Sequence, residues 1–95
     1  MNALTNKPVT MSSREIAELT GKNHFDVMQD IRKMLESLGK DESKFAGIYL
    51  DAYKREKPCF NLPRREVEIL LTGYSIPLRA KVIDRLHELE EQAKG

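Results

Sequence analysis

The stretch MSSREIAELTGKNHFDVMQDIRKML, residues 11–35, decides the fold of this chain. Its first part, SREIAELT, predicts a short helix that Ser12 or Ser13 caps and that Gly21 ends. A second helix is expected over about 24–38, because apolar residues recur there at helical spacing. Two helices joined by a tight polar turn have the outline of a helix-turn-helix.

A β-hairpin is expected after the two helices. The alternating segments GIYLDAY (47–53) and PCFNL (58–62) predict its strands, and KREK (54–57) predicts a basic tip. Pro63 then opens a third helix, and a long last helix covers 76–94. The expected fold is α+β and mostly helical, a winged helix-turn-helix with the order helix, helix, hairpin, helix, helix.

Length and composition predict a single domain in a reducing compartment. Residues 1–8 are expected to be a disordered or extended lead-in, and 9–95 one winged helix-turn-helix-like domain. The one cysteine, Cys59, can form no disulfide within the chain, and no apolar run is long enough to span a membrane. The N-terminal segment lacks the charged-then-apolar pattern of a leader. We therefore expect a cytoplasmic protein with no membrane partner.

The sequence offers no combination of side chains that is typical of an active site. His24 and His87 are far apart, and neither has metal-ligand spacing around it. Cys59 lies in an alternating apolar segment, where a small buried side chain is more typical than a nucleophile. Phosphate-cradling glycine loops and Gly-x-Ser-x-Gly are absent from the sequence. No catalytic residue, metal or cofactor is expected, and the protein is not expected to be an enzyme.

Basic side chains are concentrated in one short segment. The net charge is only +1, yet residues 54–65 hold five basic residues and one acidic residue. Such a patch is typical of phosphate binding, whereas lysines at a strand edge can also serve only to prevent aggregation. The residues of this segment that we expect to contact a phosphate backbone are Lys54, Arg55, Lys57, Arg64 and Arg65.

The outward face of the second helix mixes groups that can read bases with acids. In a helix-turn-helix the N-terminal part of this helix enters the major groove, where glutamine pairs with adenine and lysine with guanine or phosphate. The DNA-binding candidates are therefore Asn23, His24, Gln29, Arg32 and Lys33. Three acidic residues of the same helix would repel a polyanion and leave room for a protein partner: Asp26, Asp30 and Glu36.

Apolar residues of the last helix form a narrow seam. They recur at spacings of four, four, three and four, and they are Leu78, Val82, Leu86, Leu89 and Ala93. Such a seam can pack on the chain's own core, or onto a second copy in the manner of a coiled coil. The second arrangement would make the protein a homodimer through helix 76–94.

Three segments resemble the Rha family of phage regulatory proteins. They are MSSREIAELTGKNHFDVMQDIRKML, YLDAY with KPCFNL, and LLTGYSIPLRAKVIDRLHELE, and they occur in the family's order from Val9 to about Glu90. The resemblance implies a phage or prophage origin and a small regulator of lysogeny or host takeover that binds DNA. Lys22 and His24 match the basic residue and the histidine that the family places before the second helix. Asn23 stands where the family often has arginine, and KREK lacks the family's glycine in the hairpin turn.

Two functions follow from these observations. The first is a phage or prophage transcriptional regulator that binds double-stranded DNA, with the second helix in the major groove and the hairpin tip on phosphates. The alternative, which the resemblance to small prophage proteins also implies, is an antirepressor that binds and inactivates a phage repressor protein. In that alternative, Asp26, Asp30 and Glu36 would mimic phosphate toward a basic partner.

Overall fold

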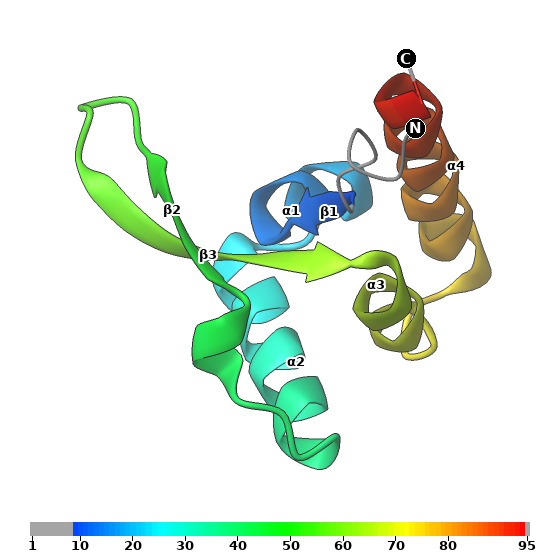
Figure 1. Cartoon of the computed structure of the whole chain (residues 1–95), viewed down its shortest axis with the longest axis horizontal. Coiled ribbons are helices and arrows are strands. Elements are labelled where there is room, and N and C mark those ends of the chain that lie inside the picture. The colour runs from blue at the N-terminus through cyan, green and yellow to red at the C-terminus, as the bar shows by residue number, and fades with distance from the viewer. Residues whose placement is uncertain (1–8, 95) are drawn as a thin grey trace.

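The computed structural model describes residues 9–94 and consists of four α-helices around a small antiparallel sheet (Figure 1). It confirms the expected mostly helical α+β fold and the order helix, helix, hairpin, helix, helix. Residues 1–8, predicted to be a lead-in, lie outside the described residues. The elements in chain order are β1 (Thr10–Ser12), α1 (Ser13–Thr20), α2 (His24–Ser37), a 3₁₀ turn (Glu42–Lys44), β2 (Ala46–Leu50), β3 (Glu56–Pro63), α3 (Arg64–Leu71) and α4 (Ile76–Lys94).

The first two helices begin and end where their local chemistry predicts. Ser12 caps α1, because its side chain accepts an N–H of the first turn at 3.1 Å. Gly21 ends α1 with a φ of 73°, in the left-handed region that glycine adopts without a Cβ clash. Asn23 then caps α2 by accepting the N–H of Phe25 at 2.8 Å. The polar turn between the helices is therefore only three residues long, at 21–23.

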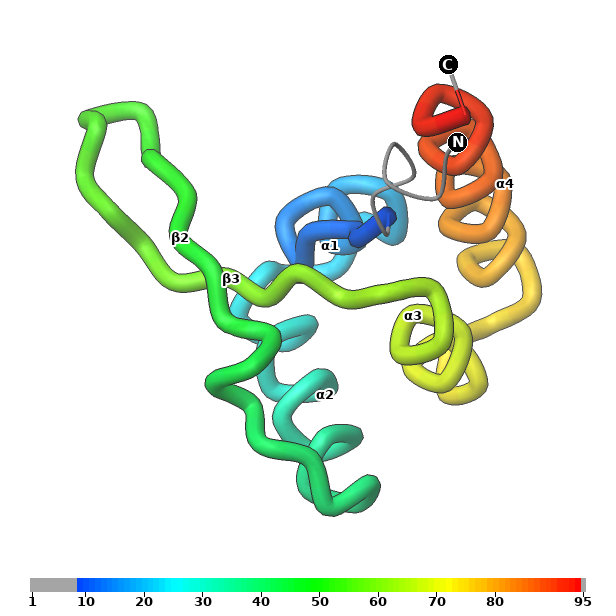
Figure 2. Tube along the Cα trace, viewed as in Figure 1, coloured from blue at the N-terminus to red at the C-terminus, as the bar shows by residue number. Residues whose placement is uncertain are grey.

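β3 is the central strand of the sheet, which has the order β1-β3-β2. Its second half pairs with β1, where Met11 lies opposite Leu62, and its first half pairs with β2, where Ile48 lies opposite Pro58. The outer part of the β2–β3 hairpin projects away from the helices (Figure 2). The sequence did not predict the third strand, because β1 has too few residues to show an alternating pattern.

The hairpin turns earlier than the sequence pattern predicts. β2 ends at Leu50 rather than at Tyr53, because the Asp51 carboxylate accepts the N–H groups of Tyr53 at 2.8 Å and Arg55 at 2.9 Å. An aspartate that bonds backbone two residues ahead turns the chain and competes with strand pairing. β3 consequently starts at Glu56, and residues 51–55 form the loop.

One hydrophobic core joins the helices to β3, which contributes Phe60 and Leu62 from the same face of the strand. Helices α1, α2 and α3 contribute most of it, and Met11 and Leu62 join from the paired strands. Helix α4 inserts Val82 and Leu86, both fully buried, and Leu89 packs partly against them. Three residues of the seam, Val82, Leu86 and Leu89, thus pack on the chain's own core, whereas Ala93 is exposed. Val82 and Leu86 are not accessible to a second copy, which corrects the dimer expectation at these two positions.

Candidate nucleic-acid interface

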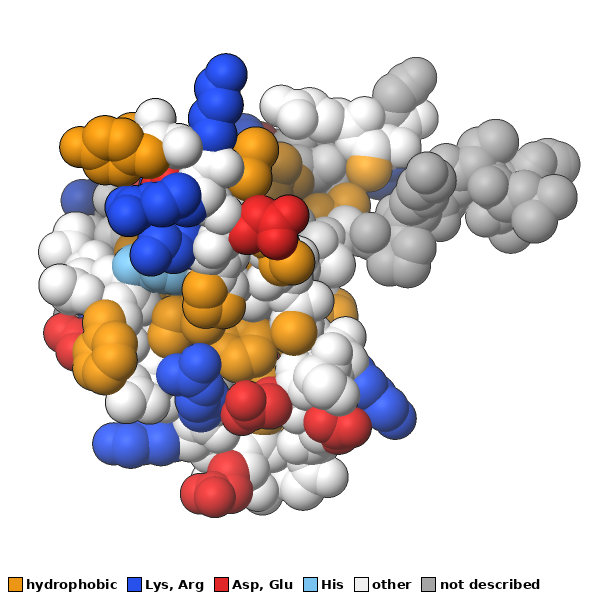
Figure 3. Space-filling view, turned by 90° about the vertical axis from the view of Figure 1, so that its left-hand side faces the viewer, with side chains coloured by type: hydrophobic (Ala, Val, Ile, Leu, Met, Phe, Trp, Pro, Cys, Tyr) orange, Lys and Arg blue, Asp and Glu red, His pale blue; other side chains and the backbone are white. Residues whose placement is uncertain are grey.

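The N-terminal half of α2 and the β2–β3 hairpin form one face of the molecule. A hollow of about 330 Å³ lies between them. Figure 3 shows this side, where Lys and Arg side chains gather beside hydrophobic side chains and a histidine. The hollow is lined by His24, Phe25, Met28 and Arg32 from α2, and by Tyr49, Lys57 and Pro58 from the hairpin.

A single buried hydroxyl fixes how these elements meet. Ser13 is fully buried, and its Oγ accepts the N–H of Phe60 in β3 at 3.0 Å. The same Oγ lies 2.8 Å from Nε2 of His24 and 3.4 Å from the sulfur of Met28, both on α2. Ser13 therefore joins the first turn of α1 to α2 and to the hairpin. Sequence analysis identified it only as one of two capping candidates.

His24 connects α2 to α1 and to the hairpin. Its Nε2 is occupied by Ser13, and its ring meets the edge of Tyr49 with centroids 5.7 Å apart. Burial, followed by the nearby charge of Arg14, lowers the pKa of His24 below its ordinary value of 6.5. The imidazole is therefore neutral at pH 7 and positions α2 against the hairpin. Its role in DNA binding remains a prediction, to which the structure adds this positioning role.

Arg14 is a cation of this face that sequence analysis missed. It is exposed at the start of α1, and its guanidinium lies 4.1 Å from the centroid of the Tyr49 ring. A cation in the first turn of a helix opposes the helix dipole, and that local mismatch was the one signal available in the sequence. With Arg14, the face receives basic side chains from α1, α2 and the hairpin.

The solvent side of α2 presents a ridge of exposed side chains. Phe25, Gln29 and Lys33 are all exposed and follow one another at intervals of four residues, which places them on one side of the helix. Asn23 precedes them at the N-cap and is also exposed. Arg32 lies beside the ridge, with its guanidinium 5.6 Å from the Phe60 ring centroid.

The three acidic side chains of α2 lie in different surroundings. Asp30 accepts a hydrogen bond from the Tyr74 hydroxyl at 3.0 Å, and Nζ of Lys22 lies 4.0 Å away. Burial and this contact with Asp30 raise the pKa of Tyr74, so that its hydroxyl stays a donor. Asp26 and Glu36 are exposed. Asp30 thus has two partners within the protein while its side chain stays 36% exposed, and a protein-binding role of the three acids remains a prediction.

The hairpin tip is held in one shape by Asp51. Besides the two backbone N–H groups, its carboxylate accepts Nε of Arg55 at 2.9 Å. These contacts lower the pKa of Asp51, the Arg55 backbone N–H being the largest cause. Lys54 is exposed at the apex with a φ of 62°, and Lys57 lies half-buried along β3. The tip thus offers cations from an ordered loop.

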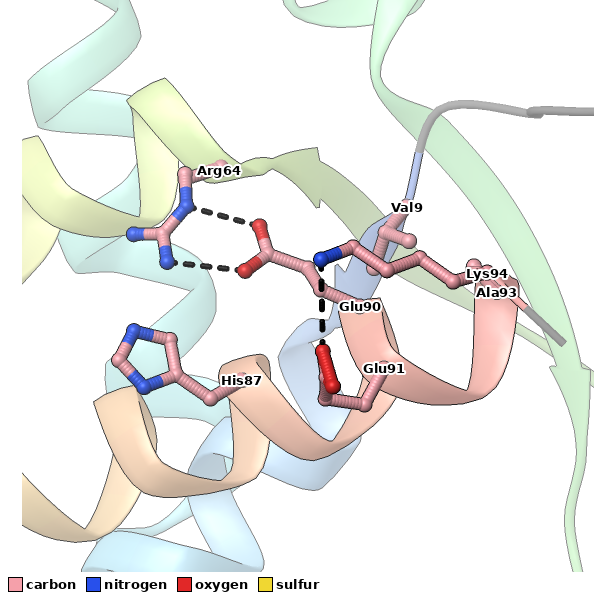
Figure 4. Close-up of a pocket in the computed structure, with 7 residues that line it drawn as sticks. All are labelled: Val9, Arg64, His87, Glu90, Glu91, Ala93 and Lys94. Carbon is pink, nitrogen blue, oxygen red and sulfur yellow. Dashed lines mark hydrogen bonds and ion pairs between the residues drawn. The ribbon is translucent and has the colours of Figure 1, made fainter.

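Arg64 and Arg65 do not belong to this face, contrary to the sequence prediction. Eight-residue β3 separates them from the tip, a span of roughly 25 Å. Arg64 binds both carboxylate oxygens of Glu90 at 2.7 and 2.9 Å and also Glu68 at 2.8 Å, so it links α3 to α4 (Figure 4). Arg65 pairs with buried Glu66 at 2.9 Å. Arg64 therefore serves the fold, whereas the Arg65 side chain is 62% exposed and bonds only its neighbour in sequence among the described contacts.

A second hollow, of about 610 Å³, lies beside the Arg64–Glu90 pair (Figure 4). It contains His87, and Glu91 and Lys94 pair across its rim at 3.4 Å. Within residues 9–94 no three His, Cys, Asp or Glu side chains come together as metal ligands. In the same part of the chain no helix is long and apolar enough to cross a membrane.

Comparison with known proteins adds the family. The family described as phage regulatory protein Rha matches residues 11–91, a range that starts in β1 and reaches the last turn of α4. No curated protein and no solved structure gave a match. The matched range contains the helix pair, the hairpin and the residues that join them. This chain therefore belongs to the phage regulatory protein Rha family.

Proposed function

We propose that this phage regulatory protein binds double-stranded DNA in the cytoplasm of the bacterial host and regulates transcription there. In this proposal α2 enters the major groove and the β2–β3 hairpin lies as a wing along the phosphate backbone. The observation that carries it is the shared face, on which α2 and the hairpin lie side by side with Arg32, Lys57 and the hollow between them. A helix pair followed by a hairpin is the arrangement of a winged helix-turn-helix.

The dimensions of α2 support this placement. A helix of 14 residues is roughly 21 Å long, and its diameter of about 10–12 Å fits the major groove of B-DNA. The ridge of Phe25, Gln29 and Lys33 is exposed along the outward side, where base edges would lie. The N-cap residue Asn23 stands at the end that would enter first.

The charge of the candidate face supports DNA binding better than the net charge of +1 of the whole chain does. Lys54 and Lys57 on the hairpin and Arg14 on α1 all lie on elements that border this face. The Lys22 ammonium lies 4.0 Å from the Asp30 carboxylate and partly offsets its charge, so Asp30 repels a polyanion less than an isolated carboxylate would. The face is therefore more basic than the chain as a whole.

The test is duplex binding across a salt series, measured by fluorescence anisotropy on fragments of the source phage's DNA. Each phosphate contact that a cation makes contributes about one unit to the slope of log affinity against log salt. The double variant Lys54→Ala/Lys57→Ala should lose up to about two units of slope. Its matched control is Lys81→Ala/Lys94→Ala, which removes the same charge from exposed positions on α4.

The control should keep the wild-type slope, because α4 packs against α1 and α3 rather than against the hairpin. Absence of duplex binding by the wild-type protein at low salt would overturn the proposal. Equal loss in both double variants would show that net charge, and not the wing, drives the binding.

An antirepressor is the second candidate, and exposed apolar side chains of the hairpin favour it. Ile48 and Leu50 are 66% and 63% exposed, and Tyr53 at the tip is 79% exposed. Exposed apolar groups on a projecting element are typical of protein contacts. The partner would be the repressor of the same phage, with Asp26 and Glu36 available to its basic groups.

This candidate predicts a complex with the purified repressor that survives without DNA. Ile48→Ser/Leu50→Ser should abolish the complex in size-exclusion chromatography. Ile76→Ser is the control, because Ile76 is 71% exposed but belongs to α4. If the wild-type protein and the repressor elute separately, the antirepressor function is excluded for that repressor.

A further inference from the structure

Phe25 is an exposed aromatic residue whose position the fold determines. It lies in the first turn of α2 and is 64% exposed. Its backbone N–H is held by the Asn23 cap at 2.8 Å, and Val27 on the opposite side of the helix is buried in the core. The ring therefore stands outward from a rigid turn, although leaving it in water forgoes the gain of burying it.

The neighbour of Phe25 on the same ridge is Gln29, one helical turn further on. Both side chains are exposed, and residues four apart are separated by about 6 Å along the helix. Stacked base pairs are about 3.4 Å apart, so the two side chains face neighbouring steps of a duplex rather than one base. Together they offer one apolar surface and one amide.

These two chemistries match the two halves of an A·T pair. In the major groove thymine presents a C5-methyl group, which phenylalanine contacts, and adenine presents N7 and N6, which glutamine binds in a bidentate manner. We infer that Phe25 and Gln29 select DNA sites rich in A·T at the position of α2. Phe25 packs against a thymine methyl, and Gln29 bonds to a nearby adenine. This inference rests on the proposed function and names the DNA class that the face selects.

The experiment starts from a duplex selected from a random pool at fixed salt. Each thymine is replaced in turn by deoxyuridine, which lacks only the methyl group. Wild-type affinity should fall about fourfold at one position, which corresponds to one buried methyl group. Phe25→Ala should bind the thymine and uracil duplexes equally. Ile76→Ala, a change at another exposed apolar residue, should keep the fourfold difference.

Gln29 is tested in the same way with 7-deazaadenine, which lacks the N7 acceptor. Wild-type affinity should fall by roughly fivefold at one adenine, and Gln29→Ala should be insensitive to that change. Phe25 and Gln29 are both exposed, so circular dichroism should show both variants folded.

The outcomes distinguish a failure of DNA binding from a failure of base reading by Phe25 and Gln29. If no duplex is selected, the proposed function fails and this inference fails with it. If a duplex is bound but wild type does not distinguish thymine from uracil at any position, DNA binding stands and the reading by Phe25 is wrong. If Phe25→Ala still distinguishes them, another residue contacts the methyl group, and the inference is overturned. If Gln29→Ala still responds to 7-deazaadenine, the adenine contact belongs to another side chain.

Discussion

At the scale of single residues, the candidate face depends on one fully buried hydroxyl, that of Ser13. The Ser13 hydroxyl joins α1 to two other elements, and two of its partners, His24 and Phe60, lie 11 and 47 residues further along the chain. A buried backbone N–H without an acceptor is costly, so the hydroxyl is needed where Phe60 enters the core. Ser13 thus connects the stability of the fold to the position of α2.

Ser13→Ala should lower the free energy of unfolding by about 1–3 kcal/mol, because it leaves the Phe60 N–H buried and unsatisfied. Urea denaturation monitored by circular dichroism measures the change. Ser43→Ala is the control: Ser43 is exposed, and its hydroxyl bonds only to the Asp41 side chain among the described contacts. Equal effects of the two substitutions would contradict the role given to Ser13.

His24 makes stability depend on pH in a defined direction. The pKa of His24 in the folded protein is below its ordinary value of 6.5, which applies in the unfolded chain. Between the folded-state pKa and 6.5, the unfolded chain therefore binds more protons than the folded one. The free energy of unfolding should therefore fall as pH is lowered from about 7.5 to about 5.5. The lowered pKa values of Asp41, Asp51 and Glu90 act in the same direction, but only near and below their ordinary values of 3.8 to 4.5.

Denaturation at a series of pH values, with His24→Gln beside the wild-type protein, measures this effect. The variant should show a flatter dependence between about pH 7.5 and 5.5. Identical slopes would mean that His24 titrates in the folded protein as it does in the unfolded chain.

At the scale of elements, the hairpin combines an ordered loop with a strained residue. Asp51 orders residues 51–55, and Lys54 at the apex adopts a φ of 62°. A non-glycine residue pays for this left-handed conformation, by about 1–2 kcal/mol.

Two matched substitutions in the hairpin should separate stability from binding. Lys54→Gly should raise the free energy of unfolding by about 0.5–1 kcal/mol, whereas Lys57→Gly, inside β3, should lower it by a similar amount. Both should weaken duplex binding, since each removes a cation from the wing. Thermal unfolding and anisotropy measure the two effects, and a stabilised Lys54→Gly that binds normally would exclude Lys54 from the interface.

At the scale of the whole molecule, α4 completes the core. Val82 and Leu86 are fully buried. Arg85 of α4 donates to Glu15 of α1 at 2.7 Å, and Arg64 of α3 donates to Glu90 of α4 at the same distance. The last helix is thus fixed to two other helices by both apolar and ionic contacts. We propose that any homodimer uses another surface, because these side chains are already covered.

Leu86→Ala should lower the free energy of unfolding by about 2–5 kcal/mol through the cavity that it leaves. The unfolding midpoint of the wild-type protein should not change with protein concentration, as it would if folding required a second copy. Ala93→Ser, at an exposed position of the same seam, should have little effect. A concentration-dependent midpoint that Leu86→Ala abolishes would restore α4 as a dimer contact.

Sequence patterns predicted what short-range chemistry determines. Helices α1 and α2 carry their own signals in Ser12, Gly21 and Asn23, each of which acts within a few residues. The patterns did not predict contacts between distant residues. Asp30 accepts a hydrogen bond from Tyr74, 44 residues later in the chain, and the sequence of α2 alone does not predict that contact.

The sequence also did not predict that the two ends of the basic segment 54–65 lie apart, because that too depends on contacts between distant residues. Residues 54–65 are consecutive in sequence, but a strand separates the two ends in space. Arg64 is bound by Glu90, 26 residues away, and no local pattern predicts that pair. Arg14, in contrast, is far from the hairpin in sequence and beside Tyr49 in space.

The positions of the first and last described residues have a practical consequence. Val9 and Lys94 line the same hollow beside α4, whereas the hairpin projects from the other side of the molecule (Figure 1). A dye, an affinity tag or a surface linker joined at the C-terminal end would therefore stand clear of α2 and the wing. Immobilised protein should present its candidate face to the solution, so that kinetic measurements on a sensor surface can follow both DNA and a repressor on the same preparation.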